Sequence, residues 1–224
     1  MSTRPYNHLI FDWDGTLMDS AAWIVHCMQR AIDDEGMTFR DERAIRGIIG
    51  LGLHEAVAQL FPDADDARVT SVCHAYRDHY FAAEDQSALF EGVVDVLNEL
   101  REAGYWLAIA TGKSRRGLSK VLSETGLEPY FSITRTADET RSKPHPLMLD
   151  EIMTDFDTGP DDCLMIGDSV FDLQMASNAG MESLAVSWGV QSSNNLQALG
   201  PAGMIHHIRE MPGWLQQQAS IKVA

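Results

Sequence analysis

The chain has 224 residues, of which 45% are hydrophobic, and this is enough to bury the core of one domain or of one domain with a smaller insertion. With 17 basic against 33 acidic residues, the formal net charge of -16 creates a field that repels nucleic acid and anionic membrane surfaces. Neither is therefore an expected partner, and a site for a small anion needs a metal ion or locally concentrated positive charge.

The sequence also bears on the compartment in which the protein works. No segment is apolar for long enough to span a bilayer, and residues 1–15 contain neither a long apolar stretch nor a small-residue cleavage site. The three cysteines, Cys27, Cys73 and Cys163, are far apart and lack metal-ligand spacing, so we expect packed thiols. These features predict a cytoplasmic protein, and nothing in the sequence indicates its oligomeric state.

The first part of the chain predicts one strand followed by helices. Residues 8–11 form a short apolar run that ends in acidic residues and a Gly15–Thr16 turn, as in a strand that delivers side chains to a sheet edge. From residue 19 to about residue 85, apolar residues recur at helical spacing, and no strand is evident. This region predicts an all-helical insertion, with helices over residues 21–32, 53–61 and 67–80.

After residue 90 the predicted strands and helices alternate. Such alternation implies parallel strands joined by crossover helices, hence an α/β fold with a doubly wound parallel sheet. Gly104, Gly126 and Gly180 are placed as helix C-caps. Ligands bind such sheets at the carboxyl ends of the strands, where four polar clusters fall. We expect helices over residues 93–103, 115–125, 146–154 and 171–179, and strands over residues 106–110, 131–134, 163–166 and 183–186.

Two aspartates follow the first predicted strand. Asp12 and Asp14 lie two residues apart, and Gly15 lets the backbone turn so that the second carboxylate can swing away from the first. One carboxylate can then attack a substrate while the other moves protons. The alternative interpretation is a pair of solvated turn aspartates, which are common at strand ends.

The next two clusters supply a hydroxyl group, a glycine and a lysine. Thr111 and Gly112 lie where a strand meets the following helix, which predicts either a phosphate cradle or an ordinary helix N-cap. For Lys113 and the two arginines that follow it, a solvated helix face is the preferred interpretation. Lys143 precedes a helix that begins with Pro146, where it can neutralise a phosphoryl group; taken alone, it also fits a surface lysine.

The fourth cluster follows the strand predicted at residues 163–166. Asp168 comes directly after it, and Asp172 lies on the first turn of the next helix. Two carboxylates so placed offer the hard oxygen ligands that Mg²⁺ prefers. Asp172 also suits a helix N-terminus, so capping competes with metal binding there, and Asp168 is the stronger metal candidate.

Taken in chain order, the four clusters resemble the four motifs of the haloacid dehalogenase-like hydrolase superfamily. The resemblance covers nearly the whole chain, and the helical insertion resembles the cap of the phosphoglycolate phosphatase-like branch. It implies a Rossmann-like core of residues 1–17 and 90–224 and a helical cap of residues 18–89. The matching residues are Asp12-x-Asp14-Gly15-Thr16-Leu17, Thr111-Gly112, Lys143-Pro144-x-Pro146 and Gly167-Asp168-Ser169-x-x-Asp172.

The resemblance implies a phosphatase that requires Mg²⁺. Asp12 is expected to form an aspartyl-phosphate, while Asp14 protonates the leaving alcohol and then activates water. The groups expected to stabilise the transferring phosphoryl group are Thr111, the Gly112 amide and Lys143. The residues expected to hold Mg²⁺ are Asp12, Asp14 through its backbone carbonyl, Asp168 and, either as a ligand or as an orienting residue, Asp172.

Other activities on the same fold are weighed against particular residues. Dehalogenases lack the metal and the second aspartate, so Asp14 and Asp168 favour phosphoryl chemistry. Phosphonoacetaldehyde hydrolases need a cap lysine, and the chain has no lysine before Lys113. A sugar phosphomutase, which needs a cationic cap site, and a non-catalytic binding protein, which would normally have lost a charged site residue, remain the alternatives.

The cap is expected to select the substrate. Its apparent specificity loop, residues 50–55, is mostly apolar, and Arg46 and His54 are the nearby basic side chains, which we take as candidate substrate contacts. Leu51 and Leu53 either select the substrate or seal the cap against water. The expected partner is a small phosphorylated metabolite, and phosphoglycolate, a sugar phosphate, pyrophosphate and a nucleotide all remain open.

Overall fold

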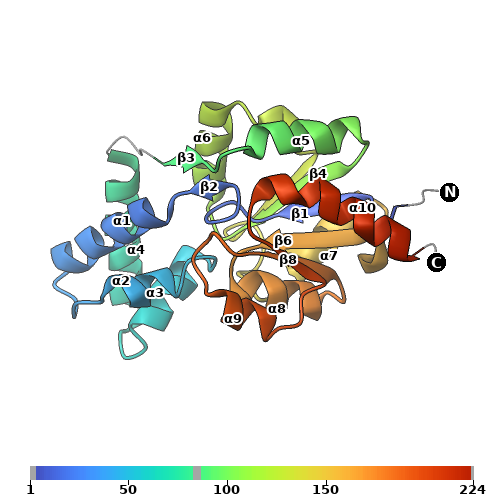
Figure 1. The fold of residues 1–224 in the computed structure, drawn as a ribbon. Coiled ribbons are helices and arrows are strands. Elements are labelled where there is room, and N and C mark those ends of the chain that lie inside the picture. The colour runs from blue at the N-terminus through green and yellow to red at the C-terminus, as the bar shows by residue number, and fades with distance from the viewer. Residues whose placement is uncertain (1–3, 83–86, 223–224) are drawn as a thin grey trace.

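The sheet of the core is parallel throughout and has six strands (Figure 1). A computed structural model describes residues 4–82 and 87–222. The strand order β5-β4-β1-β6-β7-β8 reverses at β1, and ligands bind at such a switch point in doubly wound sheets. The strands are β1 (His8–Phe11), β4 (Trp106–Thr111), β5 (Ile133–Thr136), β6 (Cys163–Gly167), β7 (Glu182–Val186) and β8 (Gly203–Ile205).

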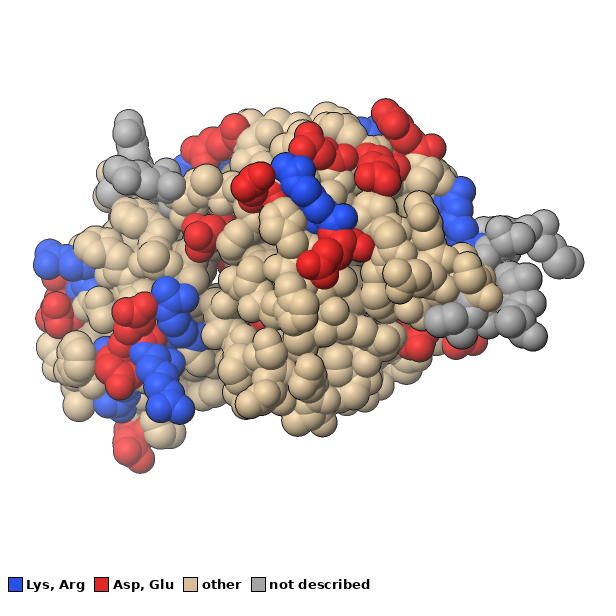
Figure 2. Space-filling view, in the orientation of Figure 1, with Lys and Arg blue, Asp and Glu red and all other residues tan. Residues whose placement is uncertain are grey.

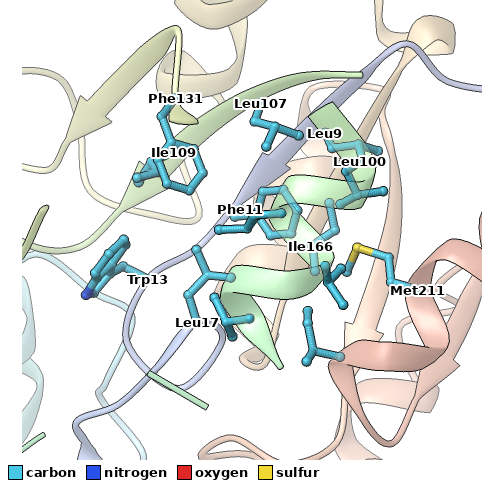
Figure 3. Packing of buried hydrophobic residues seen from close by; sticks show 14 of the residues in the cluster. Leu9, Phe11, Trp13, Leu17, Leu100, Leu107, Ile109, Phe131, Ile166 and Met211 are labelled. Carbon is cyan, nitrogen blue, oxygen red and sulfur yellow. The ribbon is translucent and has the colours of Figure 1, made fainter. Parts of the chain in front are cut away.

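Helices cover both faces of this sheet, which is why β1 is buried along its whole length. Leu9 and Phe11 point to one face, where they pack under α5 (Val93–Glu102), α6 (Arg115–Thr125) and α10 (Met211–Lys222), as Figure 3 shows for Leu100 and Met211. Ile10 points to the other face, which is covered by α7 (Leu147–Asp155) and α8 (Val170–Asn178). This alternation is the period-two pattern of a strand buried on both sides.

Short elements complete the core. The helix α9 (Ser193–Gln197) packs through Leu196 against Leu173 of α8. Three 3-10 helices lie in connections, at Glu128–Tyr130, Pro160–Asp162 and Ile208–Glu210. Among the described residues, no helix combines the length and the apolar character that crossing a membrane requires.

The region between β1 and α5 folds as a helical lobe with its own apolar cluster (Figure 1). Its buried residues include Met28, Ile45, Val57 and Val72, one from each of its helices. An antiparallel ribbon of β2 (Met18–Asp19) and β3 (Ala88–Leu89) pairs the two segments that connect the lobe to the core. The lobe helices are α1 (Ala21–Asp34), α2 (Glu42–Arg46), α3 (Leu53–Leu60) and α4 (Asp66–Ala82).

The predicted fold class is confirmed, and most predicted elements lie within a few residues of their observed bounds. The strand expected at residues 131–134 is displaced to 133–136, because Phe131 is buried by side-chain packing on Phe11 and Trp13 and precedes the strand. The short α2, α9, β2, β3 and β8 were not predicted. The division of the chain at residues 17/18 and 89/90 stays a prediction.

The glycine and cysteine predictions can be checked directly. Gly104, Gly126 and Gly180 have φ angles of 84°, 69° and 69°, the left-handed conformation expected just after a helix. All three cysteines are buried free thiols. Burial raises the pKa of Cys73 to about 11 and that of Cys163 to about 12, so these thiols are packing residues.

Candidate active site

The site residues predicted in the core meet at the carboxyl edge of the sheet. Phe11 is in register with Ile109 of β4 and Ile166 of β6, so the residues that follow these strands emerge side by side. Asp12, Thr111 and Asp168 therefore lie at one edge although they are distant in the sequence. All three are buried, and Asp14 is buried as well, which excludes solvated turn aspartates as the interpretation of Asp12 and Asp14.

Three carboxylates form a compact cluster at this edge. One oxygen from each of Asp12, Asp168 and Asp172 lies within 4.8 Å of the others. Ionised carboxylates at this distance repel one another strongly in a buried site. The cluster therefore requires protons or cations as counter-charge.

Lys143 supplies one such cation. Its Nζ lies 2.8 Å from Oδ1 of Asp12 and 2.6 Å from Oδ1 of Asp172, and its side chain is fully buried. Burial alone would lower the pKa of the Lys143 ammonium, but the two carboxylates outweigh burial and hold that pKa above its usual range. Lys143 is thus a buried cation of the site and not a surface lysine.

Asp172 is held at both carboxylate oxygens. Oδ1 accepts a hydrogen bond from Lys143, while Oδ2 accepts from the amide of Ser169 at 3.0 Å and from its hydroxyl at 2.7 Å. Together with the bond that Ser169 accepts in return, this is a capping box at the start of α8. The structure shows the capping role directly; a bond from Asp172 to a metal stays a prediction.

Asp168 is fixed by two donors and by two close glycines. The hydroxyl of Thr16 donates to Oδ1 at 2.9 Å, and the amide of Val190 donates to Oδ2 at 2.7 Å. A Cβ on Gly15 or on Gly189 would lie 2.3 Å or 2.2 Å from this carboxylate, so both positions require glycine. Burial, reinforced by the charges of Asp172 and Asp12, raises the pKa of Asp168 well above its usual value.

Asp12 differs from the other two aspartates because its carboxylate is not held by hydrogen-bond donors. Neither oxygen is hydrogen-bonded within the described residues, although the Lys143 ammonium lies beside Oδ1. Burial raises the pKa of Asp12 to about 7, against the opposing charge of Lys143. Its oxygens are thus available to a ligand.

Asp14 turns away from this cluster, as the Gly15 turn predicts. The Gly15 φ angle is 81°, and the Asp14 carboxylate accepts hydrogen bonds from the Ser20 hydroxyl and from the Lys113 ammonium. The two aspartates of the first motif therefore have different surroundings. One is available to a ligand, and the other is held in place.

Lys113 was expected on a solvated helix face, but the structure places it in a buried ion pair with Asp14. Its side chain is only 7% exposed, and its Nζ lies 2.9 Å and 3.0 Å from the two oxygens of Asp14 and 3.0 Å from the hydroxyl of Tyr80. The solvated helix face does not hold for this residue. Its position directly after Thr111-Gly112, in a chain with four lysines, was the available signal. Tyr80, which was also missed, comes from the helical lobe.

Thr111 and Gly112 form the part of the edge that the lobe covers. The Thr111 hydroxyl accepts a hydrogen bond from the Lys113 amide at 3.2 Å. A Cβ on Gly112 would lie 2.5 Å from the Leu51 carbonyl oxygen and 2.6 Å from that of Gly50, so the predicted specificity loop rests on this glycine. The Ser142 hydroxyl beside Lys143 also accepts from the Gly52 amide at 2.7 Å, which joins lobe and core a second time.

A pocket of about 260 Å³ lies between this edge and the lobe. Asp12, Asp14, Thr111, Gly112 and Lys113 line it from the core, and the lobe adds mostly apolar side chains, which include Ile24, Met28, Leu51, Leu53 and Phe81.

The two predicted cap contacts are placed differently with respect to this pocket. His54 lines it, but its Nε2 lies 3.0 Å from Asp66 Oδ1. Arg46 does not line the pocket, and its guanidinium contacts Glu42 at 2.7 Å. Contact of either residue with substrate stays a prediction. Arg77 of α4, which was not predicted, also lines the pocket.

Comparison with known proteins identifies the family. Residues 9–186 match the family described as haloacid dehalogenase-like hydrolase. The chain belongs to this family. The family match confirms the resemblance drawn from the four motifs, and the protein is an enzyme of the haloacid dehalogenase-like hydrolases.

Two curated relatives of this hydrolase span nearly the same length. A probable phosphatase named IndB from Dickeya dadantii is 35% identical over 210 residues, which covers 92% of this chain and 91% of that protein. The pyrophosphatase PpaX of Bacillus cereus is 26% identical over 206 residues, with coverage of 92% and 94%. Both names describe hydrolases of phosphate compounds.

A solved structure shows the same fold. It is described as a predicted phosphoglycolate phosphatase from Haemophilus somnus and superimposes with a TM-score of 0.84 at 20% identity, with 95% of this chain and 98% of that chain covered. At this identity the likeness shows the fold alone.

Proposed function

We propose that this hydrolase is a Mg²⁺-dependent phosphomonoesterase that acts on a small phosphorylated metabolite through an aspartyl-phosphate on Asp12. The observation that carries the proposal is the Asp12 carboxylate. It is buried, it lines the pocket, its oxygens accept no hydrogen bond from the described residues, and Lys143 lies 2.8 Å away. These are the surroundings of a nucleophile that meets an anionic substrate.

The donor set of the cluster fits a divalent metal. The ammonium of Lys143 contacts two of the three carboxylates, and its one positive charge leaves an excess of two negative charges when all three are ionised. Asp12 and Asp168, with the backbone carbonyl of Asp14, would hold Mg²⁺, while Asp172 would orient Lys143. The metal would supply the charge neutralisation that lets an anionic carboxylate approach an anionic phosphoryl group.

Each residue of the site has its own role in the proposed reaction. Asp12 attacks phosphorus while Lys143 and Thr111, with the Gly112 amide, bind the phosphoryl oxygens and stabilise their charge. Asp14 gives a proton to the leaving oxygen and then takes one from the water that hydrolyses the phosphoenzyme. Pocket residues on the core side include each of these groups except Lys143, which reaches the site through its contact with Asp12 at 2.8 Å.

The side chains that the lobe contributes to the pocket favour a substrate with an organic leaving group. Its side of the pocket is mostly apolar, and apolar walls bind carbon surface better than they bind a second phosphate. The relatives named phosphatase and pyrophosphatase support phosphate-ester or anhydride hydrolysis as the reaction class. A phosphoglycolate-like or sugar phosphate substrate is the class that we propose.

A sugar phosphomutase is the second candidate because Arg77 of the lobe lines the pocket. A mutase must grip a second phosphate, and Arg46 lies outside the pocket while His54 contacts Asp66. We therefore place hydrolysis first. A non-catalytic binding protein is disfavoured because all the charged site residues are present and face one another.

The proposal is tested by release of inorganic phosphate from p-nitrophenyl phosphate and a panel of phosphometabolites, with Mg²⁺ and with EDTA. We expect turnover with Mg²⁺ that EDTA abolishes, and values of kcat/KM that rank the substrates. Inactivity across the panel with Mg²⁺ would favour the binding protein. Conversion of one sugar phosphate isomer into another, without phosphate release, would favour the mutase.

A further inference from the structure

Lys113 joins three segments of the chain at one atom. Its Nζ binds both oxygens of Asp14 in the loop after β1, and it binds the hydroxyl of Tyr80 in α4 of the lobe. The side chains of Lys113 and Asp14 are 7% and 11% exposed, so the ion pair is largely shielded from water. Such a pair has much better-defined geometry than an exposed one.

The backbone of Lys113 is also fixed. Its amide donates to Thr111 Oγ1 at 3.2 Å, and its carbonyl accepts from the Ala137 amide at 3.1 Å. The backbone from which the ammonium projects is therefore held at both of its hydrogen-bonding groups, and the buried side chain is held at its end by Asp14 and Tyr80. With the Ser20 hydroxyl as the other donor, the Asp14 carboxylate has one defined orientation.

The contacts fix the direction of the Asp14 carboxylate. It accepts two bonds from an ammonium and one from a hydroxyl, so its oxygens have a defined position from which to meet the proton of a water. In the second half of the proposed reaction, a water oxygen bonds to phosphorus, the bond from phosphorus to Asp12 breaks, and the proton of the water passes to Asp14.

We propose that Lys113 is a positioning residue that holds Asp14 for the activation of this water, and that Tyr80 makes this arrangement depend on the helical lobe. Tyr80 is 4% exposed and belongs to α4, so its bond to Lys113 exists only while the lobe lies over the site. The inference rests on the proposed phosphatase function and adds a coupling between lobe position and breakdown of the phosphoenzyme.

The test is stopped-flow turnover of p-nitrophenyl phosphate, because nitrophenolate leaves without a proton and the first half of the reaction does not need Asp14. For Lys113→Met we expect a burst of about one nitrophenolate per active site, followed by a steady state about 10- to 100-fold slower than in the natural enzyme. Lys113→Arg should restore part of the steady-state rate. Tyr80→Phe should show the same burst with a smaller loss.

Two matched controls separate positioning from general damage. Lys120→Met removes another ammonium that lies 6.0 Å from the centre of the Tyr80 ring but makes no contact with Asp14 among the described residues. Tyr130→Phe removes a hydroxyl that binds Asn98 at 2.9 Å, away from the pocket. Both should behave as the natural enzyme does.

Several results would overturn the inference. If Lys113→Met has an unchanged steady-state rate, or if its burst is slowed as much as its steady state, Lys113 has no specific role in phosphoenzyme breakdown. If the steady-state rates of Tyr80→Phe and Tyr130→Phe are equal, the proposed coupling to the lobe is refuted. If Lys113→Met does not fold, Lys113→Arg and Tyr80→Phe decide in the same assay. Inactivity of the natural enzyme on the whole panel would instead refute the proposed function.

Discussion

Two aspartates separated by one residue have opposite environments in this site. The Asp12 carboxylate is buried beside the Lys143 ammonium and, among the described residues, is held by no hydroxyl or amide, while that of Asp14 accepts from Lys113 and Ser20. Free oxygens suit attack on phosphorus, and held oxygens suit directed proton transfer. The difference comes from the turn at Gly15, whose φ angle of 81° sends the two side chains apart.

We expect Asp14→Asn to lower kcat by about 10²- to 10⁴-fold, because the amide neither gives nor takes a proton. The loss should be larger for an alkyl phosphate, whose alkoxide needs a proton to leave, than for p-nitrophenyl phosphate. Steady-state rates on the two substrates measure this. Equal losses on both would show that Asp14 does not protonate the leaving group.

The raised pKa of Asp12 gives a stability prediction. Its pKa is about 7 in the folded protein against 3.8 ordinarily, so the folded state holds an extra proton between these values. The stability that this contributes is present below pH 3.8 and is lost as the pH rises through 7. Mg²⁺ bound to the ionised carboxylate is expected to offset the loss.

The corresponding measurement is thermal unfolding with Mg²⁺ and with EDTA at pH 5.5 and pH 8. We expect Mg²⁺ to raise Tm more at pH 8, because at pH 5.5 the ion must displace the proton from Asp12. The same increase at both pH values would contradict metal binding through this carboxylate.

At the scale of elements, the loop at residues 50–52 is as much a part of the site as the strand ends are. It rests on Gly112, and its Gly52 amide donates to the Ser142 hydroxyl next to Lys143. Both contacts fix the lobe against the edge where the phosphoryl group would bind. Substrate binding and lobe position are therefore expected to be coupled.

Gly112→Ala tests this contact. The added Cβ would lie 2.5 Å from a backbone oxygen of Leu51, so the loop must move away from the edge. We expect kcat/KM to fall at least about tenfold, since displacement of positioning elements commonly has effects of this size or larger. Gly159→Ala is the matched control, because nothing lies within 4 Å of its Cβ. Equal kinetics for the two variants would contradict a role for the loop contact.

The strands and their terminal aspartates were predictable because their signals are local. An apolar run such as residues 8–11, followed at once by acidic residues, predicts both a buried strand and the edge where it ends. Lys113 was not predictable in this way. Whether its ammonium meets water or Asp14 depends on α4, which brings Tyr80 from 33 residues earlier in the chain. Asp172 was predicted ambiguously because one carboxylate can both cap a helix and face a cluster.

At the scale of the whole molecule, the charge of the site contrasts with that of the chain. The net charge is -16, and Figure 2 shows basic side chains interspersed with acidic ones on the face it presents. Lys113, which lines the pocket, and Lys143, which contacts Asp12, are both buried and paired with aspartates. Attraction of an anionic substrate therefore depends on short-range contacts inside the pocket and on the metal that the carboxylates would hold.

Asp12, as the proposed nucleophile, is expected to carry the phosphoryl group during turnover. The most direct measurement is mass spectrometry of enzyme quenched with acid during turnover of p-nitrophenyl phosphate with Mg²⁺, compared with Asp12→Asn. We predict one phosphoryl group on the peptide that contains Asp12, and a folded Asp12→Asn variant with neither phosphoenzyme nor turnover. Substantial turnover by Asp12→Asn, or a phosphoryl group on another residue, would contradict it.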